Sequence, residues 1–173
     1  MKKALIVAGL LSISSSAFAS SDLSKFYILG GVSDIEESDS DESRTGFNII
    51  LGGEVTDNVA LETAFYRADI DEKVYGVNVD ASVSAITVAP VIYFDLNENF
   101  TLLGKAGVAY GFSEAKGCSM GYCASESDNE TAFTYGAGLQ LNYEKFALRF
   151  SYDKYSGDYY DFNVMSASVG ARF

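Results

Sequence analysis

The chain has 173 residues, the length of one domain, and carries a formal net charge of −12 at pH 7. Such an acidic chain repels nucleic acid, which excludes the DNA- and RNA-binding classes. It contains no histidine, so Ser-His and Cys-His nucleophile systems are excluded and we expect no enzyme. A single proline, with recurring aromatic residues between Gly and Asn-Asp breaks, indicates an all-β fold.

Residues 1–19 have the features of a signal peptide. Lys2 and Lys3 supply the positive start, residues 4–11 supply the apolar segment, and a small-x-small cleavage site follows. The apolar segment is too short for a membrane anchor, because a spanning helix needs about 20 apolar residues. We therefore predict an exported mature domain of residues 20–173, and no later stretch is apolar enough for a helical span.

Eight segments of the mature chain alternate between apolar and small or polar residues. They cover residues 25–33, 47–55, 59–66, 83–94, 102–112, 133–142, 146–153 and a last strand that ends at 166–173. Period-two alternation is the signal of a strand with one apolar face. Pro90 lies inside the fourth segment and lacks a backbone donor, so we expect a bulge or irregularity there.

The clearest alternation runs through residues 133–155. From Phe133 every second residue is apolar, and the pattern restarts at Phe146 after a short polar break. Two such runs joined by a tight turn predict a β-hairpin. Each strand approaches ten residues, which is the length of a tilted strand that crosses a bilayer.

The connections between the segments alternate between long and short. The long ones are residues 34–44, 69–82, 113–130 and 156–159, and the short ones are 56–58, 95–99 and 143–145. In an up-and-down meander all long loops lie at one end, as in outer-membrane barrels. The sequence therefore predicts an eight-stranded antiparallel transmembrane β-barrel in the outer membrane of a Gram-negative bacterium.

Alternation alone does not distinguish a membrane barrel from a soluble one that buries its apolar stripe inside. The less apolar stripe is mostly Gly, Ala, Ser, Asn and Tyr, with isolated charges at Glu54, Glu62, Lys105 and Arg149. This composition suits the filled interior of an eight-stranded barrel better than a water-facing surface. Aromatic residues also gather near the strand ends, as interfacial girdles do. We therefore expect the apolar stripe to face lipid.

Two cysteines and an acidic stretch lie in the predicted long loops. Cys118 and Cys123 in an exported protein indicate a disulfide that closes a small loop, whereas a metal site would need further ligands. The acidic residues of 34–44 could bind Ca²⁺, but they lack spaced ligands around a turn glycine. We therefore expect a solvated loop and no metal site.

Several motifs resemble the OmpA-like transmembrane domain and the related OmpX/Ail barrels. They are residues 26–27, 52–58, 61–62, 104–107 and the closing segment 169–173. The resemblance covers nearly the whole mature chain and rests on the order and spacing of the motifs. It implies contact with the lipid bilayer and lipopolysaccharide and a monomeric state. Since the sequence ends at Phe173, we expect no wall-anchoring domain.

The resemblance also implies roles for individual residues. Lumen-facing charges of the OmpA-like family form ion pairs that block the bore, and the matching positions here are Glu62, Lys105 and Arg149. Gln140 stands where that family has a second carboxylate, which argues against a switchable gate. Phe173 resembles the terminal aromatic signal that the outer-membrane assembly machinery recognises. For Glu62 and Arg149 we prefer the packing of a polar interior over a plug that sets conductance, because buried charges must be paired.

Three functions remain open from the sequence. We prefer a small non-enzymatic outer-membrane barrel with a structural role in the envelope and four outward loops. The second is an Ail-like adhesin or resistance protein whose host or surface ligand binds at the loops, where specificity usually lies. The third is a narrow porin, or a lateral port for small hydrophobic molecules. None of them calls for a cofactor.

Overall fold

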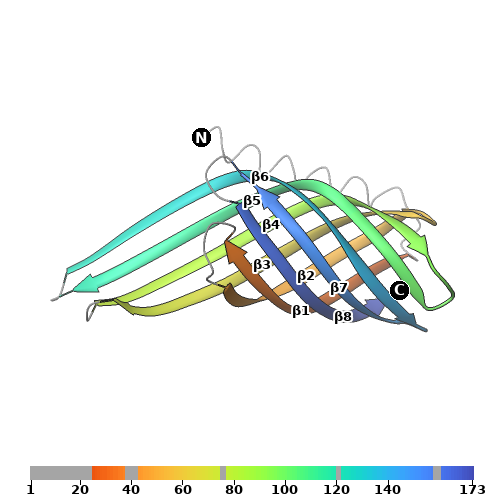
Figure 1. Cartoon of the computed structure of the whole chain (residues 1–173), viewed down its shortest axis with the longest axis horizontal. Coiled ribbons are helices and arrows are strands. Elements are labelled where there is room, and N and C mark those ends of the chain that lie inside the picture. Colours follow the sequence, from red (N-terminus) through yellow and green to blue (C-terminus); the bar gives the residue numbers. More distant parts are fainter. Residues whose placement is uncertain (1–24, 38–42, 75–76, 120–121, 158–160) are drawn as a thin grey trace.

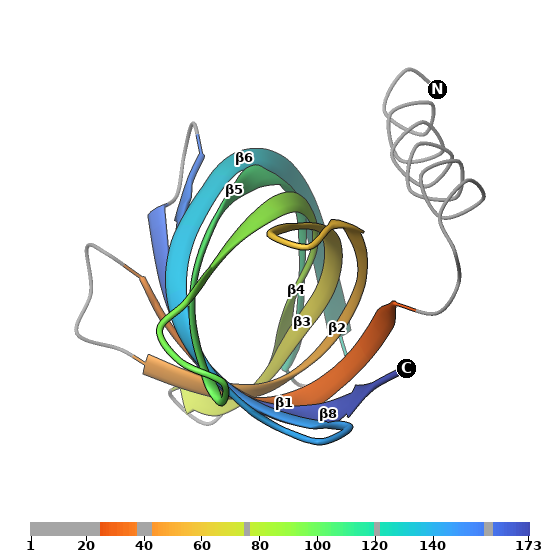
Figure 2. The same ribbon diagram turned by 90° about the vertical axis from the view of Figure 1, so that its right-hand side faces the viewer.

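The computed structural model describes residues 25–37, 43–74, 77–119, 122–157 and 161–173. These residues form one closed antiparallel barrel in which each strand pairs with its sequence neighbours and β8 closes on β1 (Figure 2). The strands are β1 (Phe26–Glu37), β2 (Ser43–Thr56), β3 (Val59–Val74), β4 (Val77–Asp95), β5 (Phe100–Ser119), β6 (Tyr122–Tyr143), β7 (Phe146–Ser156) and β8 (Asp161–Arg172). The predicted fold class is confirmed. Among the described residues, none forms a helix with the length and hydropathy that a membrane crossing requires.

The strands place their apolar stripe on the outside of the barrel. Large hydrophobic side chains such as Ile28, Ile49 and Val169 are exposed, while serine, threonine and asparagine side chains are buried inside. On β4 the inward residues include Val91 and the outward ones include Ile92, as the alternation predicts. Closure gives every strand two hydrogen-bonded neighbours, which removes the free edges that hydrocarbon cannot solvate.

The two ends of the barrel differ. We call the end at which β1, β3, β5 and β7 finish the loop end, and the opposite end the turn end. At the turn end the connections are tight, with residues 57–58, 96–99 and 144–145 joining the strands. At the loop end β3 to β6 continue well past the other strands, so that one side of the barrel projects (Figure 1).

The predicted loops at 34–44, 69–82 and 113–130 are too long. The hairpin ladders continue to the pairs Glu36↔Ser43, Val74↔Val77 and Ser119↔Tyr122. Beyond the apolar band both faces of a strand are in water, so polar residues do not end a ladder whose backbone groups remain paired. Alternation therefore marked the edge of the apolar band and not the ends of the strands.

Pro90 pairs with Leu61 on β3, and the ladder on its other side is interrupted. Between the pairs Val88↔Val108 and Val91↔Lys105 the β4–β5 ladder has a gap without any change of register. The irregularity expected from the missing donor is thus a gap and not a bulge. A register shift lies instead near the turn end of β2, between Glu54 and Thr56.

Candidate functional site

The centre of the lumen holds one buried polar cluster around Arg149 and Glu62, whose side chains are 1% and 3% exposed. Arg149 Nη1 donates to Glu62 Oε1. The same guanidinium donates through Nε and Nη2 to Gln140 Oε1, at 2.9 and 2.7 Å. Tyr27 donates its hydroxyl to Glu62, and the Tyr27 and Tyr93 oxygens lie 2.6 Å apart. Strands β1, β3, β4, β6 and β7 thus meet across the bore through five side chains.

A second buried ion pair lies beside the first. Lys105 Nζ is 3.0 Å from Asp153 Oδ2, and the two side chains are 7% and 0% exposed. Together the two pairs contain two carboxylates, one guanidinium and one ammonium, so the cluster is formally neutral. Neutrality matters because an unpaired buried charge costs far more than a paired one.

Two glycines allow these contacts to cross an intervening strand. Tyr27, Gly52 and Glu62 are successive partners on β1, β2 and β3, and a Cβ on Gly52 would lie 2.0 Å from the Tyr27 ring. Lys105 and Asp153 flank Gly136 on β6 in the same way. A Cβ on Gly136 would meet Asp153 Oδ1 at 2.0 Å. Each glycine therefore leaves room for a polar contact that spans three strands.

We expect Gly52→Ala to lower the free energy of unfolding by about 1–3 kcal/mol, the usual cost of overpacking. The added methyl group would push the Tyr27 ring aside and break its hydrogen bond to Glu62. Urea unfolding in phospholipid vesicles measures the loss. Gly104→Ala is the matched control, because a Cβ there meets nothing within 4 Å, and its effect should stay within about 0.5 kcal/mol. Equal effects of the two changes would contradict this account of Gly52.

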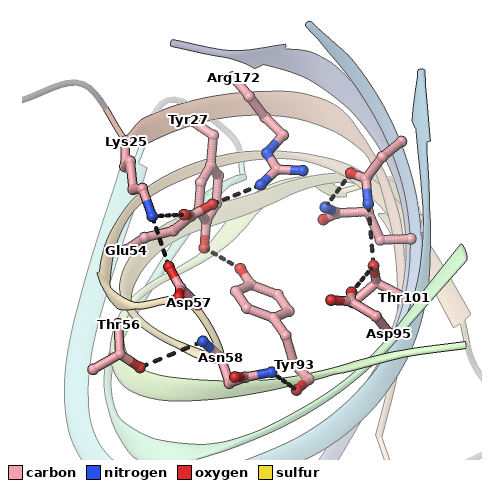
Figure 3. Close-up of polar contacts among 12 residues, drawn as sticks. Lys25, Tyr27, Glu54, Thr56, Asp57, Asn58, Tyr93, Asp95, Thr101 and Arg172 are labelled. Carbon is pink, nitrogen blue, oxygen red and sulfur yellow. Dashed lines mark hydrogen bonds and ion pairs between the residues drawn. The ribbon is translucent and has the colours of Figure 1, made fainter. Parts of the chain in front are cut away.

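A hydrogen-bonded chain connects the central cluster with the turn end. Gln140 Nε2 donates to Asn142 Oδ1 at 2.7 Å, and Asn142 Nδ2 donates to Thr101 Oγ1 at 3.1 Å. Thr101 in turn donates to Asp95 Oδ1 at 2.7 Å, as Figure 3 shows. These hydrogen bonds satisfy polar groups that would otherwise be free to bind a solute in the bore.

The turn end opens into a polar cavity of about 350 Å³. On one side of it Arg172 donates to Glu54 at 2.6 Å, and Lys25 lies 2.8 Å from Asp57 (Figure 3). The Lys25 ammonium lowers the pKa of the exposed Asp57 carboxyl through this hydrogen bond. The cavity ends at Tyr27, Tyr93 and Gln140, which belong to the central cluster, so it does not pass through the barrel.

The structure brings Glu62, Arg149 and Gln140 together, and Lys105 lies beside them with a different carboxylate. Asp153 is the group that the sequence reasoning missed. It stands on the same face of β7 as Arg149, which was the available signal. The second buried carboxylate among the described lumen residues thus lies on β7 and not at position 140.

Other predicted positions lie partly outside the described residues. Cys118 and Cys123 are directly opposite each other in the β5–β6 ladder, but their side chains are outside the described part, and the disulfide stays a prediction. Residues 38–42 of the acidic stretch and the predicted signal peptide, residues 1–19, also lie outside the described residues. Within the described ranges no three Cys, Asp or Glu side chains are grouped as metal ligands.

Comparisons with known proteins agree with this architecture. The family model described as outer membrane protein beta-barrel domain matches residues 5–173. Outer membrane protein X of Enterobacter cloacae is 27% identical over 176 residues, which is 100% of each chain. The attachment invasion locus protein of Yersinia pseudotuberculosis serotype I (strain IP32953) is 30% identical over 139 residues, covering 77% of this chain and 74% of that protein.

A solved structure shows the same barrel. The crystal structure of Ail, the attachment invasion locus protein of Yersinia pestis, in complex with the heparin analogue sucrose octasulfate, has a TM-score of 0.63 and 27% identity. The match covers 86% of this chain and 97% of that one. With an apolar outer stripe, eight closed strands and a family match over nearly its whole length, the chain belongs to the outer membrane protein beta-barrel domain family and is a small outer-membrane barrel of the OmpX/Ail type.

Proposed function

We propose that the protein is a structural, non-enzymatic component of the outer membrane whose lumen is closed to solutes. The observation that carries this proposal is the buried neutral cluster of Glu62, Arg149, Lys105 and Asp153. Side chains fill the bore of an eight-stranded barrel, and here the filling groups are bonded to one another from five strands. A porin needs a continuous water-filled path through its lumen, and this cluster supports a lumen in which that path is blocked.

The remaining features of the proposal concern how the barrel is made and placed. The loop end faces outward and the turn end faces the periplasm, as in bacterial barrels with tight periplasmic turns. Phe173 acts as the assembly signal, and its ring stacks on that of Phe26 at the start of β1, with the ring centroids 4.7 Å apart. Residues 1–19 act as the signal peptide. Cys118 and Cys123 form a disulfide. The barrel is a monomer in contact with phospholipid and lipopolysaccharide, since closure leaves no free strand edge within the apolar band to pair with a second copy.

The envelope role is tested with a strain that lacks the protein. We expect loss of the chain to raise sensitivity to detergent and to large antibiotics that an intact outer membrane excludes. Resupplying the full chain should restore resistance, and so should a variant in which a two-residue turn replaces residues 113–130. Unchanged sensitivity of the deletion strain would contradict the envelope role. If the full chain restores resistance and the shortened variant does not, the function lies in the projecting hairpin of residues 113–130.

A second candidate, adhesion through that hairpin, is favoured by one observation. The β5–β6 ladder continues from Ser113↔Asp128 to Ser119↔Tyr122, beyond the strands of the other side of the barrel. The Ail relative is solved with a heparin analogue, but residues 113–130 here carry Glu114, Glu126, Asp128 and Glu130 against one lysine. Their charge repels sulfated glycans and suits a basic protein ligand. Loss of cell binding after deletion of residues 113–130 would support adhesion.

A further inference from the structure

Beyond the apolar band, β6 has a neighbour on one side only among the described strands. The β6–β7 ladder ends at the pair Phe133↔Ser156, whereas β6 continues with β5 to Ser119↔Tyr122. Residues 122–128, which we call the β6 edge, therefore pair with β5 alone and border the projecting part of the barrel (Figure 1). Alternate backbone N–H and C=O groups of such a strand point away from its single neighbour and can pair with a further strand.

The β6 edge is exposed and acidic. Glu126 and Asp128 are separated by one residue, so both carboxylates lie on the same face of the strand, and both side chains are exposed. Their partners on β5 are Ala115 and Ser113, which carry no charge. A strand added to the β6 edge would place its own side chains opposite these carboxylates, on the side away from β5. The edge thus offers backbone pairing and two negative charges in a fixed register.

A second copy of this chain is a poor occupant of the β6 edge. The other border of the projecting part is β3, whose residues 68–74 pair with β4 alone among the described strands. This stretch carries Asp69, Asp71 and Glu72 against Lys73. Like charges opposite each other in a sheet are destabilising, so the edges of two copies repel each other. The occupant must instead bring positive charge.

From this arrangement we infer that the β6 edge docks an extended segment of another protein with Lys or Arg at alternate positions. The segment adds a strand to the sheet, so that its backbone pairs with β6 and its cations lie opposite Glu126 and Asp128. Backbone pairing supplies the affinity, and the carboxylates select basic sequences. This inference gives the adhesion candidate a binding mode and rests on that proposed function for its place outside the cell. It does not depend on the envelope role.

The test uses the full chain in phosphatidylcholine nanodiscs, whose surface has no net charge to attract a basic peptide. The probe is a short capped peptide in which threonine and lysine alternate. We expect it to bind saturably and to slow the hydrogen exchange of backbone amides in residues 122–128, measured by NMR. Amides of residues 133–141, which already pair on both sides, are the internal control. Absence of binding, or slowed exchange in residues 68–74 alone, would overturn the inference.

Two further peptides distinguish strand pairing from simple attraction between charges. The same peptide with every backbone nitrogen methylated keeps its charge but cannot donate backbone hydrogen bonds, and it should bind at least about tenfold more weakly. A peptide of alternating threonine and glutamate keeps the alternation and reverses the charge, so it should not bind. Binding of either peptide as tight as that of the lysine peptide would overturn the inference.

Charge reversal on the chain itself locates the site. Glu126→Lys with Asp128→Lys should weaken binding of the lysine peptide about tenfold and allow the glutamate peptide to bind. Glu98→Lys with Glu144→Lys changes the net charge equally at the turn end and should leave the binding of both peptides unchanged. Equal effects of the two double variants would contradict the site. If deletion of residues 113–130 abolishes cell binding but no peptide binds, adhesion stands and pairing at the β6 edge is overturned.

Discussion

Replacing Arg149 by alanine should lower the free energy of unfolding of the barrel by about 3–5 kcal/mol. The guanidinium is 1% exposed and donates to Glu62, Gln140 and Tyr93. Its removal would leave the Glu62 carboxylate buried without its counter-charge, and an uncompensated buried charge is the main cost of breaking such a pair. Urea unfolding in phospholipid vesicles, followed by heat-modifiable gel mobility, measures the difference.

Two further variants separate this effect from the general loss of an arginine. Arg67 is 43% exposed and pairs with Asp69 at 2.8 Å, so Arg67→Ala should cost at most about 1 kcal/mol. The double variant Glu62→Leu with Arg149→Leu removes both charges and should be closer in stability to the unaltered chain than Arg149→Ala is. A loss from Arg149→Ala no larger than that from Arg67→Ala would contradict a stabilising role of the central cluster.

Asp153→Ala is expected to have the second large effect, again about 3–5 kcal/mol. Its carboxylate lies 3.0 Å from Lys105 Nζ, and both side chains are buried. The variant would leave an ammonium group in the lumen with its nearest carboxylate removed. The same unfolding measurement applies.

The rescue experiment for this pair is Lys105→Met in the Asp153→Ala background. Methionine keeps much of the length of the lysine side chain and removes its charge, so a large part of the lost stability should return. Stability of the double variant below that of Asp153→Ala alone would show that the two groups do not act as a pair. The experiment thereby distinguishes the loss of a counter-charge from the loss of packing.

The barrel could be predicted from the sequence because contact with lipid requires apolar side chains on its outer face. On β7 the residues Phe146, Leu148 and Phe150 face outward and those between them face inward, and this period of two is readable without a structure. The ends of the strands were not readable. Residues 113–119 and 124–130 lie beyond the apolar band, where a ladder continues through backbone bonds that impose no pattern on side chains.

The candidate site was partly predictable for a related reason. Inward charges such as Glu62 and Arg149 stand out among small residues, so their presence in the lumen could be expected. Which charge meets which depends on strand tilt and on side chains that lean across a neighbouring strand. Lys105 reaches Asp153 over Gly136, two strands away, and alternation along one strand carries no information about that contact.

The closed lumen is tested most directly by planar-bilayer recording of the purified, heat-modifiable wild-type protein. The buried pairs Glu62–Arg149 and Lys105–Asp153, with the hydrogen bonds around them, predict no steady conductance above that of the bare bilayer. Arg149→Ala, recorded alongside, should show little added conductance, although its free energy of unfolding is much lower. A large, steady conductance of the wild-type protein would contradict the account.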